Sequence, residues 1–347
     1  MMKKITLAAT LAVSATPALA EIERTDFTVS ARDNGRLFVR EVSDRAAAGG
    51  KPPVILLHGA RVPGVASFDL PVEGGSLAAD LAKAGHRVFV MDARGYGGSS
   101  RPGQDAPPKG APLSRSDEVV ADLAAVIDAV KERTEQPKVA LLGWATGGHW
   151  AGMYASQNPE NVSHLVLYNS LYGAHSGHAT LGPGSAAADP KDPTRFDAEK
   201  VGAYRMNTAA SLLPSWDNSI PVEDNSEWRD PAVVEAYQAA ALASDPTSGT
   251  REPPSFRAPS GALADSFELA SGRKLWEAGP ITARVLILRS GNDFWSRPED
   301  VTTLENELTN AQTVRAVTIT DATHYVHLDR SEKGRDRFLT EVTEFLQ

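Results

Sequence analysis

The sequence predicts an α/β protein with a mostly parallel sheet and a large insertion after the sixth strand. From residue 54 to about residue 170, short apolar runs with strand character alternate with helical patterns. Such alternation is typical of a parallel sheet with right-handed crossovers. Between residues 171 and 280 the alternation stops, and stretches rich in Gly, Pro and Ser separate helical patches. The strand pattern resumes at residue 284, so we expect the same sheet to continue there.

The individual elements follow from local pattern. Residues 26–30 and 36–42 flank Asp33-Asn34-Gly35, a hairpin turn signal that suits an antiparallel sheet edge. The later strands are short apolar runs, each ending at a polar or glycine-containing turn. We expect them at residues 54–57, 87–91, 138–142, 162–169, 284–289 and 314–319. Helical patterns occupy residues 75–84, 114–133, 148–155 and 232–243.

The N-terminus has the pattern of a secretory signal. Lys3 and Lys4 precede an apolar stretch at residues 5–13, and Ala18-Leu19-Ala20 is a small-x-small cleavage site. The apolar stretch is shorter than the roughly 20 residues that a spanning helix needs. We therefore predict a signal peptide at residues 1–20, cleavage near Ala20 and an exported (periplasmic or secreted) protein. The alternative is a membrane anchor retained by failed cleavage.

Composition excludes several function classes. The 347 residues are 41% hydrophobic and 23% charged, as in an ordinary globular protein. The formal net charge of −9 disfavours nucleic acid and anionic membranes as partners. There is no cysteine and the eight histidines are scattered, so we predict no metal site and no disulfide. The expected partner is a small molecule.

The most informative motif lacks its central residue. Residues 143–147 read Gly-Trp-Ala-Thr-Gly, which is a G-x-S-x-G nucleophile elbow with Ala145 in the place of serine. The pentapeptide follows the strand at 138–142 and opens the helix at 148–155, as this strand–turn–helix motif requires. A methyl group cannot attack a carbonyl. Thr146 is a poor substitute, because its side chain stands one position off the tip of the turn.

Four further signatures follow strands in a fixed order. They are His58-Gly59-Ala60-Arg61, the run Asp-Ala-Arg-Gly-Tyr-Gly-Gly-Ser at 92–99, Gly291-Asn292-Asp293, and Asp321-Ala322-Thr323-His324. Together with the elbow they resemble the α/β-hydrolase superfamily, in particular capped serine esterases. The resemblance implies a catalytic domain at residues 21–170 and 281–347, with a cap or lid at residues 171–280.

The same resemblance assigns the site. It places Ala145 at the nucleophile position, Asp293 as the triad acid and His324 as the base. His327 is the rival base, but it is expected to begin the last helical region, where it would pack or cap. No carboxylate stands after the sixth strand, where some members carry the acid, and this favours Asp293.

The remaining site residues surround these positions. The oxyanion hole would be formed by the backbone amides of Thr146 and of either Ala60 or Arg61, because one residue of register stays open. Substrate would contact three aromatic side chains that flank the elbow and the acid. These are Trp144, Phe294 and Trp295.

The implied parent activity is hydrolysis of a carboxylic ester through an acyl-serine intermediate, with no cofactor. Amides and lactones stay open as substrates, since one triad serves all three. A dehalogenase or epoxide hydrolase would carry aspartate at the elbow. Ala145 has two explanations: a deliberate serine-to-alanine change, or a natural pseudoenzyme that acts as an exported ligand-binding protein. Retention of Asp293, His324 and both elbow glycines favours the first.

Overall fold

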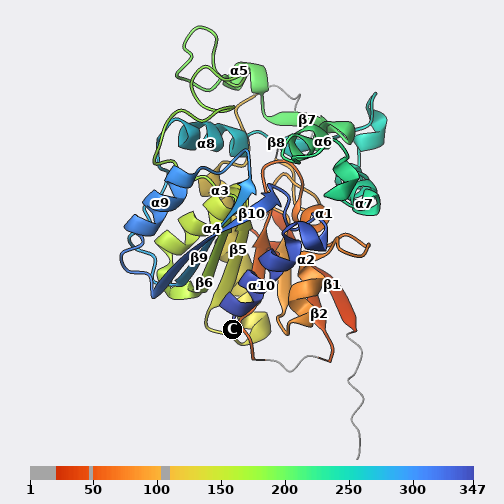
Figure 1. Cartoon of the computed structure of the whole chain (residues 1–347), viewed down its shortest axis with the longest axis vertical. Helices are drawn as coiled ribbons and strands as arrows, with labels where there is room; N and C mark the ends of the chain where they lie inside the picture. Colours follow the sequence, from red (N-terminus) through yellow and green to blue (C-terminus); the bar gives the residue numbers. More distant parts are fainter. Residues whose placement is uncertain (1–20, 47–49, 103–109) are drawn as a thin grey trace, which may run out of the picture.

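The computed structural model describes residues 21–46, 50–102 and 110–347 (Figure 1). The predicted signal peptide, residues 1–20, lies outside the described residues. Within the described part of the chain, no helix combines the length and the apolar character needed to cross a membrane.

An eight-stranded sheet forms the centre of the molecule, with strand order β1-β2-β4-β3-β5-β6-β9-β10. The pairs from β4 to β10 are parallel, whereas β1–β2 and β2–β4 are antiparallel. The predicted fold class and the antiparallel edge are therefore confirmed. The strands are β1 Ile22–Ser30, β2 Arg36–Asp44, β3 Val54–Leu57, β4 Val88–Met91, β5 Val139–Trp144, β6 Val162–Tyr168, β9 Arg284–Asn292 and β10 Thr313–Thr323.

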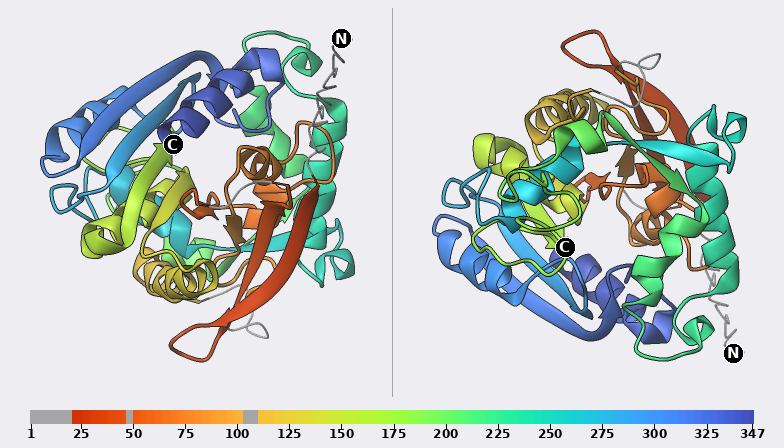
Figure 2. Two further views of the ribbon diagram at one scale, coloured as in Figure 1. Left: turned by 90° about the horizontal axis from the view of Figure 1, so that it is seen from below. Right: turned by 90° about the horizontal axis from the view of Figure 1, so that it is seen from above.

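Helices cover both faces of this sheet. Adjacent residues of one strand enter different apolar clusters: Leu56 packs with α2 and α10 on one face, and Ile55 with α3, α4 and α9 on the other. The long β1–β2 hairpin projects beyond these layers (Figure 2). The helices are α1 Gly64–Phe68, α2 Leu77–Lys83, α3 Ser116–Thr134, α4 Thr146–Gln157, α9 Pro298–Glu307 and α10 Arg335–Phe345.

The insertion between β6 and β9 lies over the end of the sheet where the parallel strands terminate (Figure 1). It contains α5 Ala198–Val201, β7 Tyr204–Thr208, α6 Leu213–Asp217, α7 Pro231–Ala243, β8 Ser255–Pro259 and α8 Gly261–Ala270. β7 and β8 form a two-stranded antiparallel sheet, which the sequence pattern did not predict because the two strands are far apart in the chain and neither is a continuous apolar run. Short 3₁₀ turns occur at Pro159–Asn161, Ala210–Leu212, Asn225–Glu227, Ser248–Thr250 and Ser331–Lys333.

The insertion shares its core with the sheet. Trp216 of α6 stacks on Tyr325, which follows β10, with ring centroids 4.8 Å apart and planes 19° apart. Both side chains belong to the apolar cluster that contains Leu56 and Trp144. Burial of such rings removes a large apolar area from water. The insertion is therefore packed against the loops that carry the predicted site residues.

Candidate active site

The sharp turn after β5 has the geometry of a nucleophile elbow. Ala145 adopts φ 51° and ψ −114°, a region that non-glycine residues rarely occupy. The flanking glycines leave no room for a side chain. A Cβ on Gly147 would lie 2.0 Å from the Leu57 carbonyl oxygen, and one on Gly143 would lie 2.3 Å from the Gly147 carbonyl oxygen. Close approach of β5, α4 and β3 therefore holds Ala145 in its strained conformation.

Asp293 and His324 form a hydrogen-bonded pair at the ends of neighbouring strands. His324 Nδ1 lies 2.6 Å from Asp293 Oδ1. The same carboxylate accepts the N–H groups of Trp295 at 3.0 Å and Ser296 at 2.8 Å. Burial alone would raise the pKa of Asp293, but the charge of His324 and these hydrogen bonds hold it below its ordinary value. An ionised Asp293 only accepts, so the Nδ1 of His324 carries a proton and donates to this carboxylate.

The other ring nitrogen of His324 is free to act. His324 lines a cavity, and its Nε2 has no hydrogen-bond partner among the described residues. In the neutral tautomer fixed by Asp293 this nitrogen has a lone pair. It can take a proton from a group in the cavity, which is the role of a general base.

His327 lies elsewhere. Its ring packs against Trp144 with centroids 4.6 Å apart, and its Nδ1 lies 3.1 Å from the hydroxyl of Tyr168. Burial lowers the pKa of His327 well below its ordinary value, so the ring is neutral. The expectation that His327 begins the last helical region is wrong, because α10 begins at Arg335 and His327 packs in the core behind Trp144.

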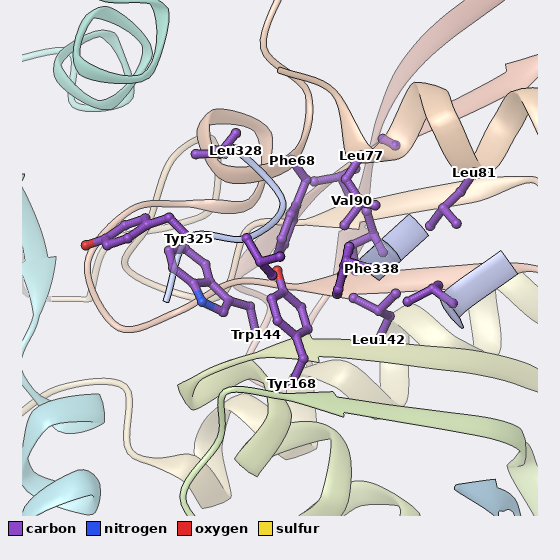
Figure 3. Packing of buried hydrophobic residues seen from close by; sticks show 14 of the residues in the cluster. Phe68, Leu77, Leu81, Val90, Leu142, Trp144, Tyr168, Tyr325, Leu328 and Phe338 are labelled. Atoms are coloured by element: carbon purple, nitrogen blue, oxygen red, sulfur yellow. The ribbon is translucent and has the colours of Figure 1, made fainter. Parts of the chain in front are cut away.

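Trp144 connects the elbow to the histidine loop. Its indole Nε1–H donates to the His324 carbonyl at 3.0 Å, and its ring lies 5.3 Å from that of Tyr325. On the other side it stacks on Tyr168 with an interplanar angle of 14°. Figure 3 shows Trp144 beside Tyr168, with Tyr325 and Phe68 nearby. The last residue of β5 thus holds the backbone of His324 in position.

The predicted site residues meet at one cavity of about 130 Å³. The structure brings all of them to its wall except Asp293, which is buried and hydrogen-bonded to His324. They are Ala60, Arg61, Trp144, Ala145, Thr146, Phe294, Trp295 and His324. Ala60 and Arg61, the two candidates for the first oxyanion donor, both line the cavity. Neither of these amides, nor that of Thr146, donates to a backbone carbonyl of the described residues.

Sequence reasoning missed the remaining wall residues. Tyr325 follows His324 directly, and its position was a usable signal. The insertion contributes side chains from three of its helices and from β7, and no motif marks them. They are Arg205, Ser215, Tyr237 and Leu263, beside Gly59 and Val62 from the turn after β3.

A second Ser/His/Asp cluster is present, but the direction of its hydrogen bonds prevents its histidine from acting as a base toward its serine. Trp276 Nε1–H donates to His149 Nδ1 at 3.0 Å, so His149 Nε2 carries the proton and donates to Ser116 Oγ at 3.0 Å. Ser116 Oγ in turn donates to Asp265 at 2.6 Å. All four side chains are buried, and burial lowers the pKa of His149 to about 4. A histidine that donates to serine cannot accept its proton.

Metal-ligating side chains do not gather in the described ranges: no group of three or more His, Cys, Asp or Glu is placed to hold an ion. The cavity is lined by His324, which is held by Asp293, and by the residues whose backbone amides are the candidate oxyanion donors. This combination can accept a proton and stabilise an oxyanion.

Comparison with known proteins agrees with this geometry. A family model described as "alpha/beta hydrolase fold" matches residues 52–331. A 2-hydroxy-6-oxononadienedioate/2-hydroxy-6-oxononatrienedioate hydrolase of Pseudomonas putida is 29% identical over 188 residues, covering 51% of this chain and 53% of that protein. A (lyso)-N-acylphosphatidylethanolamine lipase of Homo sapiens is 31% identical over 117 residues, or 34% of this chain and 30% of that protein. The chain spans about half the length of the Pseudomonas putida hydrolase and of two hydrolases of the same name from other bacteria.

Solved structures show the same fold. A meta-cleavage product hydrolase of Pseudomonas fluorescens, a serine-to-alanine mutant complexed with acetates, has a TM-score of 0.58 at 18% identity, covering 92% of this chain and 96% of that one. An esterase of Thermogutta terrifontis has a TM-score of 0.56 at 18% identity, with 93% and 98% covered. At such identities the likeness concerns the fold alone.

Proposed function

The chain belongs to the α/β-hydrolase family, and we propose that its cavity is a hydrolase active site. The site would take a small carboxylic ester, and it lacks its nucleophile because position 145 is alanine. One observation carries the proposal. Ala145 stands in the strained elbow conformation, at a cavity that also contains His324, held by Asp293 at 2.6 Å. A strained turn of this kind costs roughly 1–3 kcal/mol and persists where the surroundings fix it. Here the turn presents the side chain at position 145 to the cavity.

With serine at position 145, each remaining group has a defined task. His324 Nε2 would take the hydroxyl proton as the oxygen attacks the ester carbonyl, and would later return a proton to the leaving alcohol. Asp293 would hold the reactive tautomer and stabilise the imidazolium. The amide of Thr146, with that of Ala60 or Arg61, would donate to the oxyanion.

The size of the cavity favours a small substrate. Its volume of about 130 Å³ is close to the ~150 Å³ of an apolar cavity that admits benzene. We propose a short acyl group, with a lipid chain excluded unless the insertion moves. The names of the relatives, which include hydrolase and lipase, support hydrolysis as the reaction class. Amides and lactones remain alternatives, because the same residues would serve them.

The second candidate is a natural pseudoenzyme that binds ligand without turnover. It is favoured by Ala145 itself, which has no hydroxyl. Among the described residues, no hydroxyl group is hydrogen-bonded to His324 Nε2 in its place. In both readings we propose that the insertion, residues 171–280, acts as a lid, and that the protein is exported after cleavage near Ala20.

Restoring the nucleophile tests the proposal. Ala145→Ser should hydrolyse p-nitrophenyl acetate or butyrate measurably, whereas the unmodified chain should stay near background. Loss of the nucleophile in a comparable triad costs roughly 10⁶ in turnover. Ala145→Ser/His324→Ala is the control and should be silent. If Ala145→Ser is folded yet inactive on acyl groups of two to eight carbons, the ester-hydrolase proposal fails and the binding protein becomes the better reading.

A further inference from the structure

Two arginines in the wall of the cavity lack the carboxylate partners that many other arginines of the described residues have. Arg61 follows the first oxyanion turn, and Arg205 comes from β7 of the insertion. Neither forms an ion pair with a described residue, and no aspartate or glutamate is among the described residues that line the cavity. By contrast, Arg94 pairs with Asp122 at 2.5 Å and Arg257 with Asp245 at 2.9 Å.

Neutral groups hold the two side chains in place. Arg61 Nε donates to Asn207 Oδ1 at 3.2 Å, and its Nη2 donates to the carbonyl and the hydroxyl of Ser211 at 2.8 and 3.1 Å. Arg205 Nη2 donates to the Ala60 carbonyl at 2.8 Å. The Nη1 group of each donates to no described residue, and Arg205 Nε is buried without a partner. Both guanidinium groups therefore keep unused donors.

This arrangement is electrostatically unfavourable without a ligand. Burial lowers the pKa of Arg205 below its ordinary value, and the nearby charge of Arg61 lowers it further. A buried charge that is not paired costs stability, and its usual compensation is an opposite charge with hydrogen bonds. An anion in the cavity would supply both.

We propose that Arg205 and Arg61 form an anion subsite, and that the substrate carries a carboxylate in addition to its scissile carbonyl. This inference rests on the proposed function, and it names the substrate class for that same site. Planar guanidinium groups suit carboxylates, because two parallel N–H groups can bind the two oxygens. The cavity volume of about 130 Å³ restricts the spacer between carboxylate and carbonyl to a few carbons.

The location of the subsite fixes the orientation of the substrate. Arg61 is the residue after Ala60, and Arg205 binds the Ala60 carbonyl, so both charges flank the oxyanion turn. A carboxylate held there would place the scissile carbonyl of the same molecule toward Ala145 and His324. The two arginines would then act as specificity residues.

Isosteric ligands test the charge requirement on the chain as it exists, because Ala145 prevents turnover. Calorimetry should find that monomethyl succinate binds about ten- to a hundredfold more tightly than methyl succinamate, in which a neutral amide replaces the carboxylate. Arg205→Met should reduce this preference to less than threefold. Arg32→Gln, which changes the same charge at an exposed position of the β1–β2 turn, should keep it.

A second measurement separates a binding role from a structural one. If Arg205 is kept for an anion, Arg205→Met removes an unpaired, half-buried charge, and the melting temperature without ligand should stay level or rise. A loss of more than about 8 °C, together with an unchanged preference in Arg61→Met, would make the pair structural and overturn the inference. Equal binding of the two esters by the unmodified chain would overturn it as well, and so would competition in which inorganic phosphate binds more tightly than monomethyl succinate.

Failure of this inference is distinguishable from failure of the proposed function. If Ala145→Ser hydrolyses both methyl esters with equal kcat/KM, the ester hydrolase stands and the anion subsite falls. If Arg205→Met in that background slows both esters equally, the arginine acts on the oxyanion and the subsite also falls. If Ala145→Ser hydrolyses neither ester but the unmodified chain still prefers the carboxylate, the subsite stands and the hydrolase fails.

Discussion

Replacing Asp293 by asparagine in the Ala145→Ser protein should uncouple folding from catalysis. Asp293 accepts hydrogen bonds from His324 Nδ1, from Trp295 N–H, and from the N–H and hydroxyl of Ser296. Oδ1 of Asp293 accepts from His324 and Trp295, and Oδ2 accepts from Ser296. An asparagine has one oxygen, so it can accept at only one of these two positions. Either orientation turns its NH₂ group toward one backbone N–H, which is left unpaired at a cost of roughly 1–3 kcal/mol.

The catalytic cost should be larger. In one orientation the NH₂ group donates to His324 Nδ1, so that Nε2 carries the proton and cannot act as a base. In the other the tautomer survives, but the negative charge that stabilises imidazolium is gone. The equivalent change in a serine protease lowers turnover by ~10⁴, or about 5 kcal/mol at 1.36 kcal/mol per tenfold.

Two assays compare these magnitudes. Urea unfolding of Ala145→Ser/Asp293→Asn should report the loss of stability, and p-nitrophenyl ester hydrolysis the loss of kcat. Asp300→Asn is a matched control, since Asp300 is buried and bonds to Arg297 and to Gly173 N–H without touching His324. It should lower stability and spare kcat. A decrease of kcat of less than tenfold in the Asp293 variant would refute the assignment of the acid.

Three further outcomes follow from the site and its support. Burial lowers the pKa of His149 to about 4, so the unfolded chain binds the proton more tightly than the folded protein. The free energy of unfolding should therefore fall as the pH drops below 6.5, by roughly 2 kcal/mol at pH 5. His149→Gln should remove this share in urea titrations at pH 7 and 5, and an unchanged pH dependence would contradict the assignment. Gly147→Ala should destabilise by about 3 kcal/mol or more, because its methyl would meet a backbone carbonyl, whereas Gly249→Ala, which meets no atom within 4 Å, should be near neutral; equal melting temperatures would contradict this. In the Ala145→Ser background, Thr146→Val should keep hydrolysis within a fewfold, since Thr146 acts through its amide, and a hundredfold loss would instead assign its hydroxyl a role.

The parts of the fold that the sequence predicted are those with strong local signals. Strands such as β5 are continuous apolar runs, and turns such as that at Gly147 admit only glycine, so both are readable without a structure. The β7–β8 pair was missed because its long-range pairing has no local signature. The placement of His327 at the start of the last helix was wrong for the same reason, since its partners Trp144 and Tyr168 come from two different strands.

The candidate site divides in the same way. Residues on the sheet loops, such as His324, follow motifs that sequence can locate. Arg205 and Tyr237 reach the cavity only because the insertion folds over the sheet, and the role proposed for Arg205 depends on the absence of a carboxylate beside it. Burial without a counter-charge is a property of three-dimensional packing, which no spacing along the chain expresses.

The central claim is that the cavity lacks nothing but a nucleophilic oxygen, and a phosphonylating reagent tests it without knowledge of the substrate. A small fluorophosphonate reacts with a serine hydroxyl that a neighbouring histidine activates. Intact-protein mass spectrometry should find one adduct on Ala145→Ser within minutes, and none on the unmodified chain or on Ala145→Ser/His324→Ala. Peptide mapping should locate the adduct at position 145. An unlabelled Ala145→Ser protein with an unchanged melting temperature would contradict the claim, and labelling that persists after His324→Ala would remove the histidine from the mechanism.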